Sequence, residues 1–226
     1  MSTGTSYTVT DERDSQTYTV AKLADGNVWM TQNLKLGKTT TSMSLTTANS
    51  DVPSGGFTLN GKLTTPKFTT SDGYTNNSSQ YYCSDNYGCY YNWYTATAGS
   101  GTSSISAAGT NVNYSICPVG WTLPTEAQHI ALTTAYGGYK STNMIISNPA
   151  TTTENANGEV PGYLYSGSYN NNGGVNVGQT GSYHSSTASS QQSLRMLRVG
   201  LVDNLYAYPS ANLNKYVGAA VRCLLK

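Results

Sequence analysis

The sequence predicts a domain of β-strands joined by turns and long loops, with one well-marked helix. Ser, Thr, Asn and Gly dominate its polar residues, and 19 Tyr stand against 2 Phe, a composition that suits half-buried strands and turns. Residues 17–34 carry a strand–turn–strand pattern, and Thr125 begins a helix signature. With 226 residues the chain can form one large core, as a single domain or as a domain with an arm.

The first third of the chain contains one hairpin signal and one long polar stretch. Residues 1–10 are polar, and we expect either a loose arm or a first edge strand. Apolar residues alternate over 17–22, Asp25-Gly26 supplies the turn, and the apolar pattern resumes at 28–30, which predicts a β-hairpin. Residues 37–80 hold no periodicity, so we predict irregular structure packed by scattered apolar side chains.

Residues 81–98 are the densest aromatic patch, and we expect them to fill the core. A platform that stacks nucleic-acid bases would interleave Lys and Arg, and neither occurs between Lys67 and Lys140. Trp93 and Thr97 have the i, i+4 spacing of a short helix.

A second helix is predicted to begin at Thr125. Gln128 lies three residues later and completes a capping box, while Gly137-Gly138 ends the helix. Ile130 and Leu132 supply apolar positions, and His129 is expected on the solvated face.

Residues 181–226 combine an ordered pattern with an unpatterned insert. Two β-like runs, 193–199 and 205–209, precede a predicted apolar strand over 218–225. Between them Arg, Asp, Asn, Tyr and Leu mix without periodicity. This arrangement is typical of a recognition surface on an ordered support, although an ordinary hairpin with a solvated turn has the same pattern.

The charge balance excludes several classes of partner. Twelve Lys and Arg oppose eleven Asp and Glu, so no net field would draw the chain onto nucleic acid or an anionic membrane. No apolar run approaches the roughly 20 residues of a membrane helix. The start of the chain lacks the basic and apolar regions of a signal peptide. We expect the protein on an extracellular surface or in a virus particle. It would reach that location either by another export route or after removal of a leader.

Four cysteines, Cys83, Cys89, Cys117 and Cys223, allow three pairings if they are oxidised. Their spacings do not form the paired units of a zinc site. We favour a link between Cys83 and Cys89, which closes an Asn-Tyr-Gly turn, and a link between Cys117 and Cys223. Buried reduced cysteines remain the alternative.

Four blocks of this sequence form a recognisable pattern: DSQTYTVAKLADGNVWMTQNL (Asp14–Leu34), YYNWYTATA (Tyr90–Ala98), ICPVGWTLPTEAQ (Ile116–Gln128), and SYHSSTASS with NKYVGAAVRC (Ser182–Ser190 and Asn214–Cys223). Together and in this order they resemble the Fibrobacter succinogenes major paralogous domain. That family is similar to the formylglycine-generating-enzyme type of C-type lectin fold.

This resemblance implies an α+β, C-type-lectin-like domain with two helices, small antiparallel sheets and much irregular loop structure. It implies one domain over 14–226 after an arm at 1–13. Trp29, Trp93 and Trp121 would pack in the core, and Cys117 would lie beside Cys223.

Departures from the family pattern suggest a ligand-binding region at about 182–220. His184 replaces a usual Trp, and the insert before Val217 is unlike the family's Tyr- and Asn-rich run. Scrambled positions between fixed ends resemble the variable proteins of diversity-generating retroelements. We expect Arg195, Arg198, Tyr206 and Tyr208 to be accessible on a common face. The full set of candidate contact residues is His184, Arg195, Arg198, Leu201, Asp203, Asn204, Tyr206, Tyr208, Asn212, Leu213, Asn214 and Tyr216.

Enzymatic and metal-dependent functions find little support in these residues. His129 is expected on a helix surface, and Asp11, Glu12 and Asp14 form a charge run expected to be solvated. Calcium needs several converging oxygen ligands, and Asp203 is nearly alone after Glu159. We expect no catalytic residue, no cofactor and no metal.

The predicted function is recognition of a macromolecule, most simply a protein receptor, by a diversified surface on a lectin-like scaffold. Neither nucleic-acid binding nor membrane insertion is expected. Two alternatives remain: a structural or adhesive cell-surface module of the same family, and a carbohydrate-binding lectin.

Overall fold

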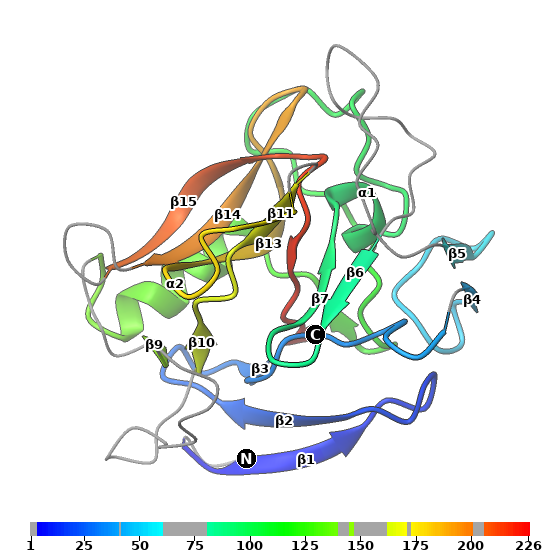
Figure 1. Cartoon of the computed structure of the whole chain (residues 1–226), viewed down its shortest axis with the longest axis horizontal. Coiled ribbons are helices and arrows are strands. Elements are labelled where there is room, and N and C mark those ends of the chain that lie inside the picture. The colour runs from blue at the N-terminus through cyan, green and yellow to red at the C-terminus, as the bar shows by residue number, and fades with distance from the viewer. Residues whose placement is uncertain are drawn as a thin grey trace.

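Over the residues it describes, the computed structural model shows two main sheets, smaller strand pairs and two helices (Figure 1). The five-stranded sheet is antiparallel, and the six-stranded sheet is antiparallel except where β13 (Thr180–Ala188) and β16 (Ala219–Ala220) pair in parallel. The structure describes residues 4–40, 42–60, 81–139, 145–146, 162–170, 173–200 and 206–226, with the backbone alone at 145–146 and 206. The described chain is therefore α+β, with far more strand than helix.

The lower sheet in Figure 1 has five strands and contains the predicted hairpin. Its order is β1 (Ser6–Thr10), β2 (Thr17–Lys22), β3 (Val28–Met30), β17 (Leu224–Leu225) and β8 (Trp121–Thr122). The hairpin of β2 and β3 is confirmed, with Ala21 opposite Trp29. Residues 6–10 are the edge strand that the sequence offered as an alternative to an arm.

The upper sheet has six strands and holds most of the region predicted to bind a ligand. Its order is β15 (Tyr206–Asn214), β14 (Ser193–Gly200), β13 (Thr180–Ala188), β16 (Ala219–Ala220), β7 (Gly88–Tyr91) and β6 (Tyr81–Ser84). The prediction of one strand over 218–225 was wrong. That run splits into β16 in this sheet and β17 in the other, so it crosses between them through the core.

Three short strand pairs complete the described sheets. They are β4 (Ser42–Leu45) with β5 (Phe57–Asn60), β9 (Ile145–Ile146) with β10 (Tyr163–Leu164), and β11 (Ser168–Asn170) with β12 (Gly173–Val175). The first pair corrects the prediction of irregular structure across residues 37–80, of which 61–80 lie outside the described residues. The pair forms because Leu45 and Leu59 both bury their side chains against the first core cluster.

Helix α2 (Glu126–Ala135) confirms the predicted capping box. Thr125 N–H donates to Gln128 Oε1 at 2.8 Å, and Gln128 N–H donates to Thr125 Oγ1 at 3.2 Å. The short helix α1 (Trp93–Ala96) is capped by the Asn92 side chain.

His129 was wrongly expected on the solvated face of α2. It is fully buried, and Ile130 is exposed instead. The buried positions His129, Leu132, Thr133 and Tyr136 follow the i, i+3, i+4, i+7 spacing of one helix face. This face packs on the upper sheet.

Three hydrophobic clusters fill the interior. The first includes Tyr18, Tyr91 and the Cys117–Cys223 disulfide. The second packs Trp29 and Leu132 against Leu197 and other residues of the upper sheet. The third surrounds Trp93. Trp29 and Trp93 are fully buried, and Trp121 is partly buried against the first cluster.

Both predicted disulfides are present. Cys83 pairs with Cys89 across the β6–β7 hairpin, and Cys117 pairs with Cys223 over a sequence separation of 106 residues. The second bond lies entirely in the core and holds the 218–225 crossing against the turn that precedes β8.

The charge run at residues 11–14 is solvated only in part: Glu12 is exposed as predicted, but Asp11 is buried and Asp14 is partly buried. The side chains of Asp11 and Arg13 are 1% and 2% exposed. Arg13 Nη2 donates to Asp11 Oδ2 at 2.6 Å, and Arg13 Nη1 donates to the carbonyl oxygen of Ile116 at 2.6 Å and to Ser50 Oγ. The pair is buried because Arg13 joins the β1–β2 turn to the chain around Cys117.

Candidate binding surface

Strands β14 and β15 form the frame of the candidate surface. Their antiparallel register sets Leu194 opposite Leu213 and Val199 opposite Ala207. Leu194 belongs to the cluster around Trp93, whereas Leu197 and Val199 belong to the cluster beneath α2. Side chains alternate along a strand, so Leu194 and the later pair Leu197 and Val199 point to opposite faces of β14. The cluster around Trp93 covers one face near the start of β14, and the cluster beneath α2 covers the other face near its end.

This alternation places Arg195 and Arg198 on opposite faces of the sheet, contrary to the predicted common face. Arg195 shares its side with Leu197 and Val199, and Arg198 shares its side with Leu194 and Met196. Both arginines lie at positions where the covering cluster ends, and both are partly exposed. The hairpin therefore offers two small polar patches instead of one.

The first patch is a polar network around Arg195. Its guanidinium lies 3.6 Å from Glu126 Oε1, at the start of α2, and Nη1 donates to Asn212 Oδ1 at 3.0 Å. Ser189 Oγ donates to the same Asn212 oxygen at 2.8 Å. With side chains 30% and 22% exposed, Arg195 and Glu126 form an ion pair that remains partly open to solvent.

The second patch consists of Arg198, Tyr208 and Tyr139. Arg198 and Tyr208 are cross-strand partners on β14 and β15. The ring of Tyr139, just after α2, meets the ring of Tyr208 edge-on with centroids 5.5 Å apart. Tyr208 is 43% exposed and Tyr139 is 58% exposed. Two exposed tyrosines beside an arginine supply large contact area at low entropic cost, which is typical of protein-binding surfaces.

His184 was wrongly placed on the binding face. Its ring is fully buried, and Nε2 lies 2.6 Å from the carbonyl oxygen of Tyr91. Burial lowers the pKa of His184 to about 4, so the ring is neutral at physiological pH. Strand β13 is buried along its whole length, because it lies between β14 and β16, so no side chain there reaches the surface.

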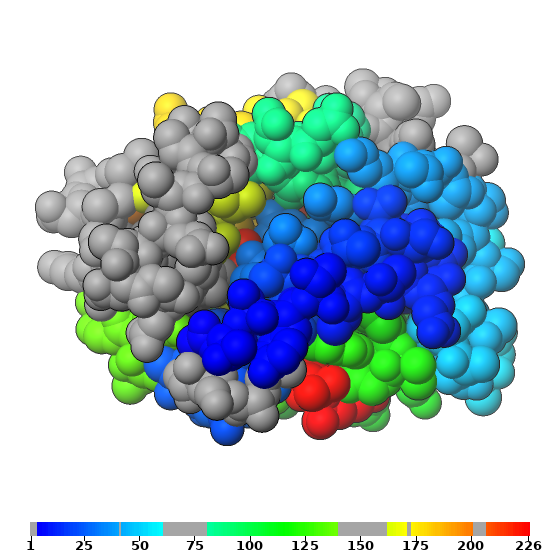
Figure 2. Space-filling model, turned by 90° about the horizontal axis from the view of Figure 1, so that it is seen from below, coloured from blue at the N-terminus to red at the C-terminus, as the bar shows by residue number. Residues whose placement is uncertain are grey.

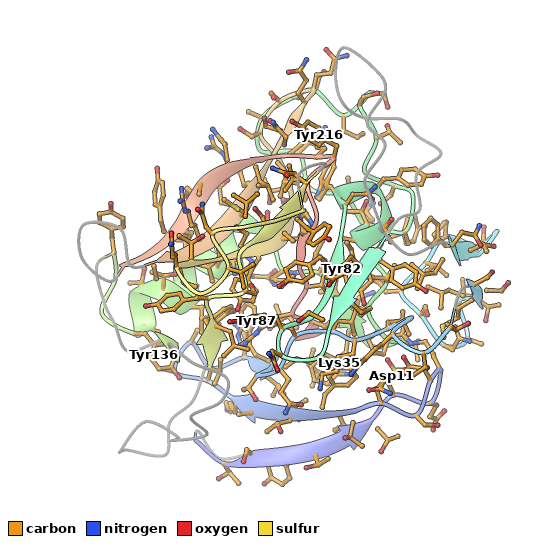
Figure 3. All side chains as sticks on the ribbon, viewed as in Figure 1. Asp11, Lys35, Tyr82, Tyr87, Tyr136 and Tyr216 are labelled. Carbon is orange, nitrogen blue, oxygen red and sulfur yellow. A yellow bond between two sulfur atoms is a disulfide. The ribbon has the colours of Figure 1, made fainter. Side chains whose placement is uncertain are left out.

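The remaining predicted contacts divide among surface, core and undescribed positions. Asn212 and Asn214 are exposed, and Tyr216, at the upper end of β15 in Figure 3, is partly exposed. Leu213 packs partly buried against the cluster around Trp93, which fits the core position that the sequence also allowed. Leu201, Asp203 and Asn204 lie outside the described residues, and only the backbone of Tyr206 is described.

Sequence reasoning missed Tyr139 and Glu126. Tyr139 directly follows the Gly137-Gly138 pair that ends the helix. An aromatic residue just outside a helix does not belong to the buried face of that helix, and this position could have marked Tyr139 as exposed. Glu126 is the first residue of α2, and its backbone N–H donates to Thr187 Oγ1 at 2.9 Å. This bond fixes the start of α2 against β13 and so brings Glu126 to Arg195.

A separate cavity of about 260 Å³ opens near the β1–β2 turn. Its walls include Val9, Met30 and Trp121, together with the buried Asp11–Arg13 pair. The four hydrogen bonds of the Arg13 side chain all go to acceptors inside the protein, so we assign the Asp11–Arg13 pair a role in holding the fold and not in binding a ligand. Among the described residues, His, Cys, Asp and Glu do not gather in groups of three that could hold a metal ion.

Neither helix in the described ranges is long and apolar enough to cross a membrane. The two disulfides are compatible with an oxidising, extracellular location.

Comparison with known proteins gives one match. The family model for the Fibrobacter succinogenes major domain covers residues 24–224. Neither the curated proteins nor the solved structures yield a match to this chain.

Proposed function

Because the chain belongs to the Fibrobacter succinogenes major domain family, we propose that it is a non-enzymatic binding protein with a C-type-lectin-like fold. The β14–β15 hairpin carries the binding residues. Its ligand is another macromolecule, most simply a protein.

One observation carries this proposal: the hairpin separates residues that hold the fold from residues that it only displays. Leu194, Leu197 and Val199 are fully buried. Arg198, Tyr208 and Asn214 belong to none of the three core clusters. Such side chains can change without loss of the fold, and this is the property that a recognition surface requires.

The exposed chemistry favours a protein ligand. Tyr and Arg are the residues most often found as energetic centres of protein interfaces. Tyr139, Tyr208 and Arg198 provide such a centre, and the Arg195–Glu126 pair adds a second patch of fixed polarity. We assign no metal or cofactor to this site.

We further propose that the displayed positions are diversified by a retroelement. The fold limits which codons of the hairpin can vary. Positions 195, 198, 208, 212 and 214 tolerate change, whereas the buried positions 194, 197, 199 and 207 do not.

The decisive observation is genomic. A near-copy of the DNA for residues 182–220 should lie beside a reverse-transcriptase gene and differ mainly at adenines. Those differences should fall in the codons of displayed residues. A complete genome without the repeat would remove diversification from the proposal.

A display library tests binding independently of the genome. Codons 198, 208, 212 and 214 are randomised in the full chain, and the library is selected against hen lysozyme as a model protein. A matched library randomises 194, 197, 199 and 207. We expect folded binders from the first library alone. Equal loss of folded protein in both libraries would contradict the proposed division of the hairpin.

A glycan array with and without calcium tests the lectin alternative. Calcium-dependent binding to a sugar would replace the protein ligand. A chain that has no repeat and yields no binders would instead fit a structural or adhesive module.

A further inference from the structure

We propose that β1 is a self-pairing edge strand through which two copies of this chain associate, with a two-fold axis at Thr8. The inference concerns the lower sheet and does not depend on the proposed function of the hairpin.

Strand β1 forms an open edge of the five-stranded sheet. Among the described strands it pairs only with β2, and in Figure 1 no described element lies beyond it. Figure 2 shows this segment, in dark blue, running across the surface seen from below. Four of its five residues are exposed. The sequence SYTVT has neither the charged residues nor the Pro that commonly protect such edges.

The hydrogen-bond ladder determines which backbone groups point outward. Asp11 N–H donates to the carbonyl oxygen of Gln16 at 2.8 Å, in the register that pairs Val9 with Tyr18 and Tyr7 with Val20. Hydrogen-bonded pairs alternate along antiparallel strands, so Tyr7 and Val9 direct their backbone groups to β2. Consistently, Thr19 is bonded to the opposite neighbour, through Thr31 N–H at 2.9 Å.

The outward N–H and C=O groups therefore belong to Ser6, Thr8 and Thr10. No described residue bonds to them. These three positions are symmetric about Thr8. If a second copy pairs antiparallel about that residue, Thr8 exchanges two hydrogen bonds with Thr8 of the second copy. Ser6 and Thr10 do the same with each other, so every outward group on both strands is satisfied.

The side chains fit the same register. Tyr7 is opposite Val20 and Val9 is opposite Tyr18, so both point to the core side of the sheet. Tyr7 is nevertheless 46% exposed, because the sheet ends beside it. In the two-fold pairing, Tyr7 meets Val9 of the second copy as a close, non-hydrogen-bonded pair. Aromatic and β-branched residues favour each other in such pairs.

A second copy fits this edge better than an unrelated strand, because one alignment satisfies both the backbone groups and the exposed Tyr7. The uncharged strand also brings no like charges together at the axis. Five residues on each side form a small contact, so we expect a dimer that depends on protein concentration.

Cross-linking tests the register directly. Thr8→Cys in the full chain sets two cysteines opposite each other with Cα atoms about 5.5 Å apart, a separation that a disulfide spans. Thr10→Cys is the matched control, because its two copies would lie about 13 Å apart. In a glutathione buffer, Thr8→Cys should give a covalent dimer on a non-reducing gel. Thr10→Cys should give one only when it is mixed with Ser6→Cys.

Sedimentation velocity of the unmodified chain provides the second measurement. The native chain should show a concentration-dependent dimer, and Thr8→Lys should weaken it at least about tenfold by opposing two charges at the axis. Circular dichroism confirms that this variant is folded. A native chain that stays monomeric at millimolar concentration would overturn the proposal. Equal cross-linking of Thr8→Cys and Thr10→Cys would overturn it as well.

Discussion

His129 Nε2 lies 3.3 Å from the carbonyl oxygen of His184, and both imidazoles are fully buried. His129 also packs against the ring of Trp29, with centroids 5.8 Å apart. Burial lowers the pKa of both histidines to about 4. The only two histidines of the chain therefore join α2, β13 and β7 as neutral core residues.

This burial predicts a loss of stability in mild acid. Between pH 6.5 and 4 the unfolded chain binds protons at both histidines and the folded chain does not, so the free energy of unfolding decreases as the pH falls. Each histidine contributes about 1.4 kcal/mol per pH unit within that window. Urea denaturation at pH 7.5, 5.5 and 4.5 measures the slope.

The double variant His129→Gln, His184→Gln is the control for this slope. Burial raises the pKa of Asp14, which acts in the opposite direction and remains in the variant. The variant should be less stable at pH 7.5 and should lose less stability on acidification. Parallel curves for the two proteins would contradict the assignment to the histidines.

Arg13 and Glu12 offer a matched test of the buried ion pair. Arg13→Ala leaves the buried Asp11 carboxylate without its partner and removes the contacts to Ser50 and Ile116. We expect it to lower the free energy of unfolding by about 3–5 kcal/mol. Glu12 is exposed, so Glu12→Ala should change this energy by less than about 0.5 kcal/mol. If the denaturation midpoints of Arg13→Ala and Glu12→Ala shifted by the same amount, the buried ion pair would add no more stability than an exposed side chain does.

The two disulfides should differ in their contribution to stability. In the chain-entropy model, the link from Cys117 to Cys223 contributes about 5 kcal/mol and the short link from Cys83 to Cys89 contributes about 2 kcal/mol. Paired Cys→Ala variants of each bond, compared by urea denaturation, measure the difference. Mass spectrometry of the unreduced native chain checks the pairing, and free thiols at Cys117 and Cys223 would contradict it.

Leu197 and Arg198 are neighbours on β14, but their substitutions should differ strongly in their effect on stability. Leu197→Ala removes a fully buried side chain beneath α2 and should cost about 2–5 kcal/mol. Arg198→Ala removes a partly exposed side chain and should cost less than about 0.5 kcal/mol. Thermal unfolding compares the two. A large loss from Arg198→Ala would assign this arginine to the fold and remove it from the binding surface.

The elements predicted correctly depend on local chemistry. The capping box at Thr125 and the hairpin turn at Asp25-Gly26 are each formed by residues close together in the chain, so their spacing alone identifies them. The β4–β5 pair was missed because its partners, such as Leu45 and Leu59, are brought together only by the shared core. The continuous apolar run at 218–225 indicates burial, but burial does not reveal which strand lies beside it.

Two errors at the candidate surface have the same physical origin. His129 was judged by its polarity, although the spacing from His129 to Leu132, Thr133 and Tyr136 already marks one helix face. Arg195 and Arg198 were grouped by residue type, although an odd separation on one strand directs their side chains apart. In both cases the period of the element was a better guide to side-chain direction than the residue type was.

The position of β17 has a consequence for biosynthesis. Leu224 pairs with Trp29 on one side and with Thr122 on the other, and Leu34 N–H donates to the carbonyl oxygen of Val221 at 2.9 Å. The lower sheet therefore stays in two pieces on the ribosome until residue 225 has emerged. Contacts this distant in sequence form slowly. Until β17 has paired, β3 has an unpaired edge, to which a chaperone could bind. Cys117 likewise stays without its disulfide partner Cys223 and could react with an oxidoreductase.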